Sequence, residues 1–398
     1  MNAAGAPQVA ARDVVMIANV MTPYRLALHR RIDRELPALR LLTIYTHDVG
    51  DQAWSLAGDD LDRVFRLGQG DQIANASRPK FALHEWRKGG RIIEFLKARR
   101  PAAAFICGYN DPGRLRVIRW CAAHKLPLFL IGDSNVRTDT ATGLKRLVKN
   151  AVVGSVVRAC RGVMPFGSSG AAYFARYGGT PATTFYVPCE PDYELITNLP
   201  QTAIDAARAR FKLDPARRRA VFCGRMIPEK RPHMALAAFL AIADQRPDLD
   251  LIMIGDGPRK AELAASVPPN LANRVLFTGF IGQQELISAL YRTSELLIMP
   301  SYYEPWGLVV NEALAGGMAI VASDLVGAVP ELVKDRVNGR IFPADDQPAL
   351  NAAVLEATDP ERLRAYRAAS ASVLAAWRRE GNPIDGLRRA LRTVGVEA

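Results

Sequence analysis

The sequence is most informative at residues 296–313, which read LLIMPSYYEPWGLVVNEA. The apolar run at 296–299 predicts a buried strand that ends at a proline, and Gly307 then begins a helical pattern. Glu304 is therefore expected on the loop after a strand, and Glu312 about one turn into the next helix. Ligands of open α/β sheets bind in the crevice outside the carboxyl ends of the strands, so this stretch predicts a binding site.

Strand-like and helix-like runs alternate along the rest of the chain, which is typical of parallel sheets with crossover helices. We predict strands at residues 14–18, 41–45, 103–107, 128–131, 220–223, 251–254, 275–277, 296–299 and 319–321. We predict helices at residues 24–36, 87–99, 114–124, 144–159, 232–243, 284–291, 307–315 and 360–379. The fold class is therefore α/β.

The chain of 398 residues is long enough for two domains with full cores. The Pro-rich stretch 186–192 interrupts the alternation and is the best linker candidate. We predict an N-terminal domain at 1–195, whose first 12 residues form a disordered tail, and a second domain at 196–360. Residues 361–398 are expected to contain a helix that packs back towards the first domain.

The composition is that of a globular protein, with 49% hydrophobic and 23% charged residues. No apolar stretch reaches the roughly 18–20 residues of a membrane span, and the N-terminus lacks the pattern of a signal peptide. The five cysteines are scattered, without close metal-binding spacing, which favours reduced thiols and a cytoplasmic location.

The net charge of +12 is concentrated in the first half, where 27 Lys and Arg face 17 Asp and Glu. This excess indicates an anionic partner or serves only solubility. Residues 137–161 combine six cations with apolar residues at helical spacing. Such a helix either lies on an anionic membrane or packs its apolar side into the core. Nucleic acid is not an expected partner, because no aromatic residues alternate with basic ones in a stacking motif.

Two cations, Arg225 and Lys230, follow a predicted strand of the second domain. At a strand end they are suited to clamp a pyrophosphate, although a solvated basic loop has the same composition. The turn at Gly255 lacks the third glycine of a dinucleotide fingerprint, since Lys260 stands there, so we expect a tight turn that lines the cleft. Backbone groups at Phe280 and Ile281 are candidates to pair with a base edge.

In the first domain, polar residues follow three predicted strands, where they are either ligand contacts or Asx-turns. We expect Thr22 to cap a helix that begins with a proline, with the free N–H groups facing the crevice. The candidates on this side are Thr22, Tyr24, Arg25, Tyr109, Asn110, Asp111, Asp133 and Ser134.

Motifs of other enzyme classes are absent from the sequence, including the nucleophile elbow, the zinc-protease motif and the P-loop. Two short Asp-x-Asp matches, at 60–62 and 248–250, are compatible with chance. No metal is therefore expected.

Taken together, these residues resemble the nucleotide-sugar domain of the retaining family 4 glycosyltransferases. The similarity extends over about residues 160–345 and includes 166–170, Asp192 and 337–339. The first half is only loosely similar, and its Pro23-Tyr24-Arg25 opening resembles members that act in bacterial polysaccharide or lipid-glycan assembly. Many members carry a histidine where this chain has Tyr109 and Asn110, which places donor-sugar contacts on that side in doubt.

The resemblance implies a GT-B fold, in which two Rossmann-like domains face each other across a cleft. It implies that Glu304 contacts the transferred sugar, that Glu312 holds the ribose, and that Arg225 and Lys230 stabilise the leaving diphosphate. Donor-binding positions are Glu312, Gly307, Leu308, Val309, Gly255, Phe280 and Ile281. The implied donor is a UDP- or GDP-sugar, without metal or other cofactor.

The implied activity is retaining transfer of a hexose to a glycan, lipid-linked or small-molecule acceptor, in the cytoplasm or at the inner face of the membrane. Two carboxylates also suit a glycosidase, but the paired cations favour a phosphate leaving group. A nucleotide-sugar epimerase, a phosphorylase and a non-catalytic sugar-nucleotide-binding protein stay open as alternatives.

Overall fold

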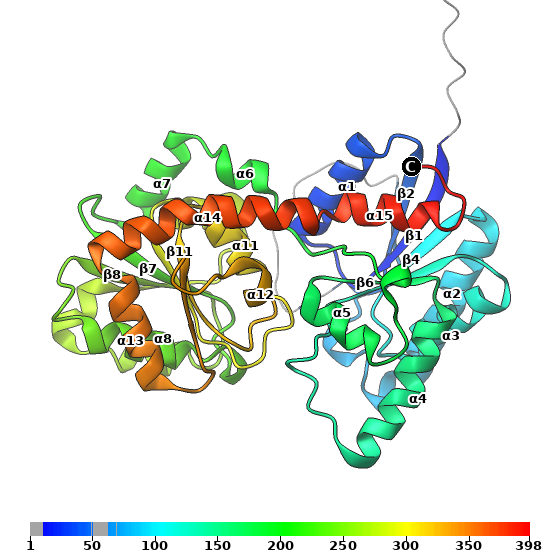
Figure 1. Cartoon of the computed structure of the whole chain (residues 1–398), viewed down its shortest axis with the longest axis horizontal. Coiled ribbons are helices and arrows are strands. Elements are labelled where there is room, and N and C mark those ends of the chain that lie inside the picture. Colours follow the sequence, from blue (N-terminus) through cyan, green and yellow to red (C-terminus); the bar gives the residue numbers. More distant parts are fainter. Residues whose placement is uncertain (1–10, 49, 51–62, 69) are drawn as a thin grey trace, which may run out of the picture.

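The computed structural model describes residues 11–48, 50, 63–68 and 70–398. Two α/β domains lie side by side, each built on a parallel sheet of six strands (Figure 1). Most of the predicted N-terminal tail and the Asp-x-Asp match at 60–62 lie outside the described residues.

The first domain has the strand order β3-β2-β1-β4-β5-β6, so the direction of winding reverses between β1 and β4. Its strands are β1 (Arg12–Ala18), β2 (Leu39–Tyr45), β3 (Val64–Arg66), β4 (Ala103–Cys107), β5 (Leu128–Gly132) and β6 (Gly162–Pro165). Its helices are α1 (Pro23–Glu35), α2 (Ala82–Arg99), α3 (Pro112–Ala123), α4 (Gly143–Ala159) and α5 (Ser168–Ala175).

The second domain repeats this topology with the order β12-β11-β10-β7-β8-β9, and winding reverses between β7 and β10. Its strands are β7 (Arg218–Cys223), β8 (Leu249–Ile254), β9 (Val275–Gly279), β10 (Leu296–Met299), β11 (Ala319–Ser323) and β12 (Gly339–Phe342). Its helices are α6 (Tyr193–Thr197), α7 (Gln201–Phe211), α8 (Pro232–Ile242), α9 (Lys260–Ala265), α10 (Gln284–Arg292), α11 (Leu308–Ala315), α12 (Val329–Leu332) and α13 (Gln347–Ala357).

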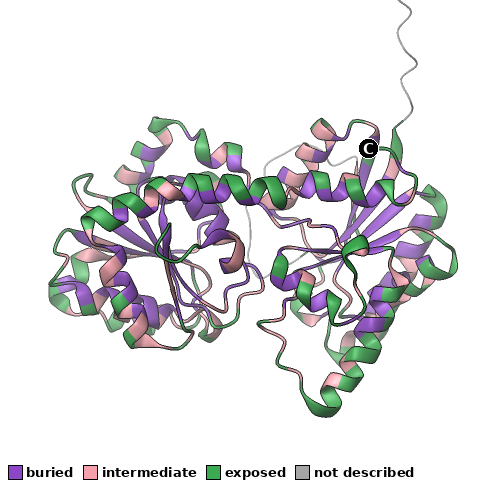
Figure 2. Ribbon diagram, viewed as in Figure 1, coloured by how far each residue is buried: buried purple, intermediate pink, exposed green. Residues whose placement is uncertain are grey.

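Helices cover both faces of each sheet, and the strands between them are buried (Figure 2). Burial on both faces explains why most strands are continuous apolar runs that the sequence predicts correctly. Three strands were not predicted, namely β3, β6 and β12, which have only three or four residues each. Each of them contains an arginine, a glycine or a proline, so none appears as a continuous apolar run like the equally short β10.

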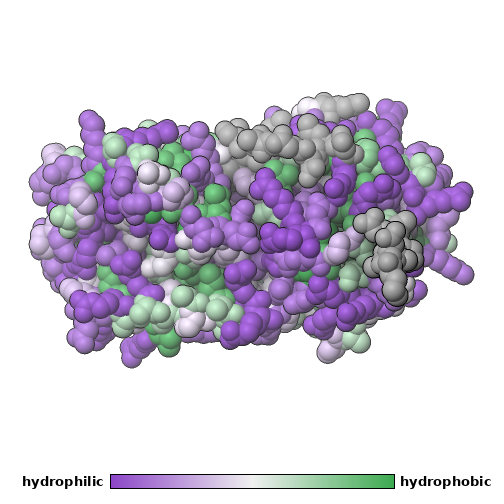
Figure 3. Space-filling model, turned by 90° about the horizontal axis from the view of Figure 1, so that it is seen from above, coloured by the Kyte–Doolittle hydropathy of each residue, from purple (hydrophilic) through white to green (hydrophobic). Residues whose placement is uncertain are grey.

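The chain crosses back to the first domain at its C-terminal end, as predicted, but it does so with two helices. The helix α14 (Pro360–Glu380) packs on the second domain, and α15 (Pro383–Arg392) continues in line with it over the first (Figure 1). Gly381 separates them where a Cβ atom would lie 2.3 Å from the Trp377 ring. Seen from above, the surface of the molecule is mainly hydrophilic, with smaller apolar areas between the polar residues (Figure 3).

Candidate active site

The carboxyl ends of β7 and β10 bring together the two parts of the predicted donor site. Lys230 follows β7 on a 3-10 turn, Pro228–Lys230, and Glu304 lies on the loop after β10. The Lys230 Nζ atom is 2.5 Å from Glu304 Oε2, and the two side chains are only 16% and 15% exposed. Because β7 and β10 are the strands between which winding reverses, this contact lies at the topological switch point, the usual position of a ligand in such sheets.

The half-buried Arg225 lies on the same loop as Lys230, and the turn at Gly255 shapes that loop. Gly255 has φ +131°, and a Cβ atom there would lie 2.0 Å from the carbonyl oxygen of Gly224. The residue after Gly255 is also bonded to the Arg225 loop, because the carbonyl oxygen of Asp256 accepts a hydrogen bond from Met226 N at 2.8 Å. Glycine is required at 255 because only its backbone can approach this closely. The structure therefore gives Gly255 a supporting position beneath the Arg225 loop.

Helix α11 begins beside Glu304 and points its N-terminus towards the same place. Gly307 precedes the helix with φ +99°, and a Cβ atom would lie 3.3 Å from Glu304 Cγ. The N–H groups of Leu308 and Val309, in the first turn, have no acceptor within the helix. The positive end of the helix dipole lies at the same turn as these N–H groups. Both favour negative charge, so the turn is suited to hold a phosphate or another anion.

Glu312 lies one turn further along α11, and only 7% of the residue is exposed. Its carboxylate accepts hydrogen bonds from Gln284 Nε2 at 2.8 Å and from the Tyr291 hydroxyl at 3.1 Å. Burial raises the pKa of Glu312 to about 7. Glu312 also lines a pocket together with Leu308, Gln284 and Tyr24 of the first domain. Gln284 and Tyr291 were not predicted as site residues, although their seven-residue spacing places them on one face of α10.

The first domain closes over this site through several direct contacts. Asn135 Nδ2 donates to the carbonyl oxygen of Pro305 at 2.7 Å, and Ser168 N donates to Glu331 Oε1 at 2.5 Å. Asp133 follows β5 and is exposed to water in the cleft. Atoms of the surrounding protein nevertheless desolvate its carboxylate, and this effect, together with the nearby Glu304, raises its pKa. Asp133 and Glu304 therefore face each other from the two domains.

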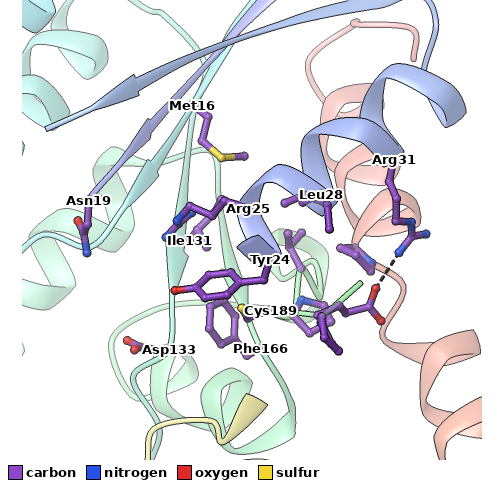
Figure 4. A pocket seen from close by; sticks show the side chains of 16 residues that line it. Met16, Asn19, Tyr24, Arg25, Leu28, Arg31, Ile131, Asp133, Phe166 and Cys189 are labelled. Carbon is purple, nitrogen blue, oxygen red and sulfur yellow. Dashed lines mark hydrogen bonds and ion pairs between the residues drawn. The ribbon is translucent and has the colours of Figure 1, made fainter. Parts of the chain in front are cut away.

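A pocket of about 190 Å³ lies next to Asp133 on the side of the first domain (Figure 4). Tyr24 and Arg25, from the first turn of α1, project into it. At its far end Arg31 Nη1 donates to Glu190 Oε2 at 2.7 Å. Burial raises the pKa of Glu190 to about 7. From the sequence, Glu190 is expected only as part of the linker at 186–192.

Several predicted residues have other surroundings than expected. Thr22 occupies the N-cap position of α1, but its hydroxyl makes no capping bond with the described backbone, so the predicted side-chain cap is wrong. Its carbonyl oxygen instead accepts from the helix N–H groups. Asp111 caps α3 and pairs with the buried Arg114, so its carboxylate is engaged inside the domain. Arg114 itself, a buried partner, has no local sequence signal.

The remaining candidates differ in how far they reach the cleft. The Tyr109 hydroxyl bonds to the Tyr173 hydroxyl at 2.7 Å, while Asn110 is exposed and Ser134 is half-buried on its loop. Ile281 packs in the core of the second domain, and Phe280 is half-buried beside it. The contact of the backbone at 280–281 with a base stays a prediction.

One group of described residues, Asp71, His84 and Glu85, has the spacing of metal ligands. The ammonium of Lys88 lies 2.8 Å from Asp71 and 2.9 Å from Glu85. A cation already balances these carboxylates, so the donor set does not fit a metal ion.

Residues 203–372 match a known family, the glycosyl transferases group 1. D-inositol 3-phosphate glycosyltransferase of Streptomyces coelicolor is 36% identical over 162 residues, which cover 38% of this chain and 34% of that protein. Alpha-D-kanosaminyltransferase of Streptomyces kanamyceticus is 31% identical over 170 residues, which cover 42% and 43%. The matches thus span between a third and a half of the length of these curated relatives.

Solved structures resemble the whole chain. Sucrose-phosphate synthase from Thermosynechococcus elongatus has a TM-score of 0.73 at 20% identity, over 96% of this chain and 100% of that one. Anabaena HepE in complex with UDP and glucose has a TM-score of 0.69 at 18% identity, over 96% and 99%. The chain therefore has the GT-B fold, and its residues 203–372 resemble the glycosyl transferases group 1 family.

Proposed function

We propose that this protein is a retaining glycosyltransferase that moves a hexose from a UDP- or GDP-sugar to an acceptor held by the first domain. The observation that carries the proposal is the meeting of Lys230 and Glu304 at the switch point, beside the N-terminus of α11. A cation and free N–H groups suit a diphosphate, and a carboxylate next to them suits the sugar attached to it. HepE, which shares the fold, is solved with UDP and glucose, and this supports a nucleotide sugar as donor.

In the proposed reaction, the bond from the sugar C1 to the phosphate oxygen breaks and a bond from C1 to an acceptor oxygen forms. Lys230 and Arg225 stabilise the charge that develops on the departing diphosphate, and Glu304 stabilises the positive charge at C1. The departing phosphate oxygen takes the proton of the acceptor hydroxyl. Glu312 holds the ribose and thereby fixes the donor in line with the cleft. No step uses a metal.

Donor binding is tested with a thermal-shift panel of UDP-, GDP- and ADP-sugars. We expect one class to raise the melting temperature, because a ligand that binds only the folded state stabilises it. That donor should be turned over only with an added acceptor and equally well in EDTA. A melting temperature that no nucleotide sugar shifts contradicts the donor site. Conversion without an acceptor favours an epimerase, and a requirement for inorganic phosphate favours a phosphorylase.

We further propose that α4 contacts an anionic membrane at the cytoplasmic face. Its outer side carries four apolar residues at helical spacing, which are between 43% and 76% exposed: Leu144, Leu147, Val148 and Val152 (Figure 2). The C-terminal part of the helix packs in the core through Val153, Val156 and Val157, whereas the four apolar residues before this part lie in solvent. Two cations of the same helix, Lys145 and Arg158, are also exposed. No described helix is long and apolar enough to cross a bilayer.

Vesicle flotation tests this contact. We expect binding to vesicles that contain phosphatidylglycerol, weaker binding to phosphatidylcholine alone, and release by salt. Exchanging Leu147 and Val148 for serine should lower the partition coefficient about tenfold or more, because two apolar side chains no longer leave water. Val337→Ser, at an exposed apolar position of the second domain, is the matched control. Indifference to lipid charge, or an unchanged double variant, contradicts the proposal.

A further inference from the structure

The pocket beside Asp133 adjoins the predicted donor site. The smaller pocket that contains Glu312 and Leu308 shares two lining residues with it, Tyr24 and Pro191. A molecule in the larger pocket would therefore lie next to the bound donor, on the side of the first domain. The larger pocket lies at the carboxyl ends of β1 and β5, where Met16, Ile131 and Asp133 line it. A molecule bound there would have the position expected of the sugar acceptor.

One of the two cations that line this pocket, Arg25, is not held in an ion pair within the described part of the chain. Arg25 extends from α1 into it (Figure 4), and its Nη1 atom donates to Cys107 Sγ at 3.4 Å. No carboxylate of the described residues forms an ion pair with Arg25. Arg31, on the same helix, is paired with Glu190 at 2.7 Å and with Glu35 at 2.9 Å. Asp133 interacts with Arg25 through space without forming an ion pair, so the N–H donors of this half-buried guanidinium are not taken up by a described carboxylate. An anionic ligand would supply the charge-assisted hydrogen bonds that this guanidinium lacks.

The opposite parts of the pocket offer hydrogen-bond acceptors. Asp133 lies towards Glu304, where the donor sugar is proposed to be. Glu190 is 8% exposed, and its Oε1 atom has no hydrogen-bond partner in the described part of the chain. Carboxylates accept hydrogen bonds from hydroxyl groups. The side chains of Met16, Leu28 and Phe166 form an apolar part of the lining of the same pocket.

We propose that Arg25 recognises an acidic group, phosphate or carboxylate, on a polyhydroxylated acceptor that occupies this pocket. Asp133 accepts a hydrogen bond from an acceptor hydroxyl beside the donor sugar. The inference rests on the proposed function and adds the chemical class of the acceptor and the residue that selects it. The donor diphosphate is not the anion meant here, since Lys230, Arg225 and α11 surround its proposed place in the second domain.

Calorimetric titration tests this selection, with the donor site filled by UDP or GDP, whichever binds. The probes are glucose 6-phosphate, glucuronate and glucose, which share a ring and differ in the acidic group. We expect at least one acidic sugar to bind about tenfold or more tightly than glucose, the range of a charge-assisted hydrogen bond. The preferred acid distinguishes phosphate from carboxylate. Arg25→Gln should abolish the preference, and Arg25→Lys should retain part of it because the charge stays.

Arg34→Gln is the matched control, since it removes an exposed cation from the same helix outside the pocket, and its preference should equal that of the wild type. Equal affinity for all three probes, no binding of either acid, or a preference that survives Arg25→Gln overturns the proposal. Weaker nucleotide binding by Arg25→Gln also overturns it, because Arg25 would then serve the donor. The binding of UDP and GDP to the wild type is measured in the same experiment. If neither nucleotide binds, that result contradicts the proposed function and not the role of Arg25.

Discussion

Replacing Lys230 with alanine should lower kcat by about 10²–10³-fold while the protein stays folded. The ammonium is proposed to stabilise charge that appears on the diphosphate only as the sugar departs, and removal of one such group typically has this effect. In the structure Lys230 contacts Glu304 at 2.5 Å, and both side chains are largely shielded from water. The low local dielectric strengthens the interaction with a developing charge. Steady-state kinetics with the donor found in the thermal-shift panel measures the effect.

The matched control is Lys334→Ala, which removes an exposed lysine of the same domain. Its kcat should stay near that of the wild type. Arg225→Ala should resemble Lys230→Ala, and the double variant should lose less than the product of the two effects, because both cations act on one diphosphate. Near-normal turnover by Lys230→Ala, with an unchanged melting temperature, would remove Lys230 from the proposed mechanism.

Glu312→Gln should change how the free energy of unfolding depends on pH. Burial raises the pKa of Glu312 from 4.5 to about 7, so the folded state binds this proton more tightly than the unfolded state. The resulting stabilisation is complete below pH 4.5 and is lost as the pH rises through 7. The neutral glutamine does not titrate. The variant should therefore gain stability relative to the wild type between pH 4.5 and 8, by up to about 3 kcal/mol. Urea unfolding at several pH values measures this difference.

The same substitution should remove a pH dependence of donor binding. Ribose hydroxyls donate more strongly to an ionised carboxylate, so wild-type affinity for the nucleotide sugar should rise about tenfold from pH 5.5 to 8. The intact sugar nucleotide is the right probe, because a terminal phosphate titrates near pH 6. Glu361→Gln, at an exposed position of α14, is the control for both measurements. An unfolding difference that does not vary with pH would show that Glu312 is ionised without cost.

Much of the fold follows from local patterns. Strands such as β4 and β10 are buried on both faces and appear in the sequence as apolar runs, which is why their positions were predicted within a residue or two. The edge strands β3 and β12 were missed because each is short and contains an arginine, which interrupts the apolar run. Their pairing depends on a neighbouring strand that is distant in sequence, and no local signal encodes it.

The candidate site likewise has a part that local sequence predicts and a part that it does not. Glu304, Glu312, Arg225 and Lys230 are recognisable because each follows a strand or begins a helix, and the carboxyl ends of parallel strands meet at one edge of the sheet. The hydrogen bonds of Gln284 and Tyr291 to Glu312 were not predicted, since they depend on how α10 packs on α11. Asp111 shows the reverse case, in which a polar residue at a strand end caps a helix and pairs with an internal arginine.

The sequence by itself determined that the chain forms two parallel α/β domains and which acidic and basic residues of the second domain stand at strand ends. These properties follow from apolar periodicity and from turn residues, which act over a few positions. Only the tertiary structure decided that Lys230 contacts Glu304, that Asp133 faces them from the other domain, and that Arg25 enters a pocket where no described carboxylate forms an ion pair with it. Those relations arise from strand order and from the closing of one domain on the other, and both depend on contacts between residues far apart in the chain.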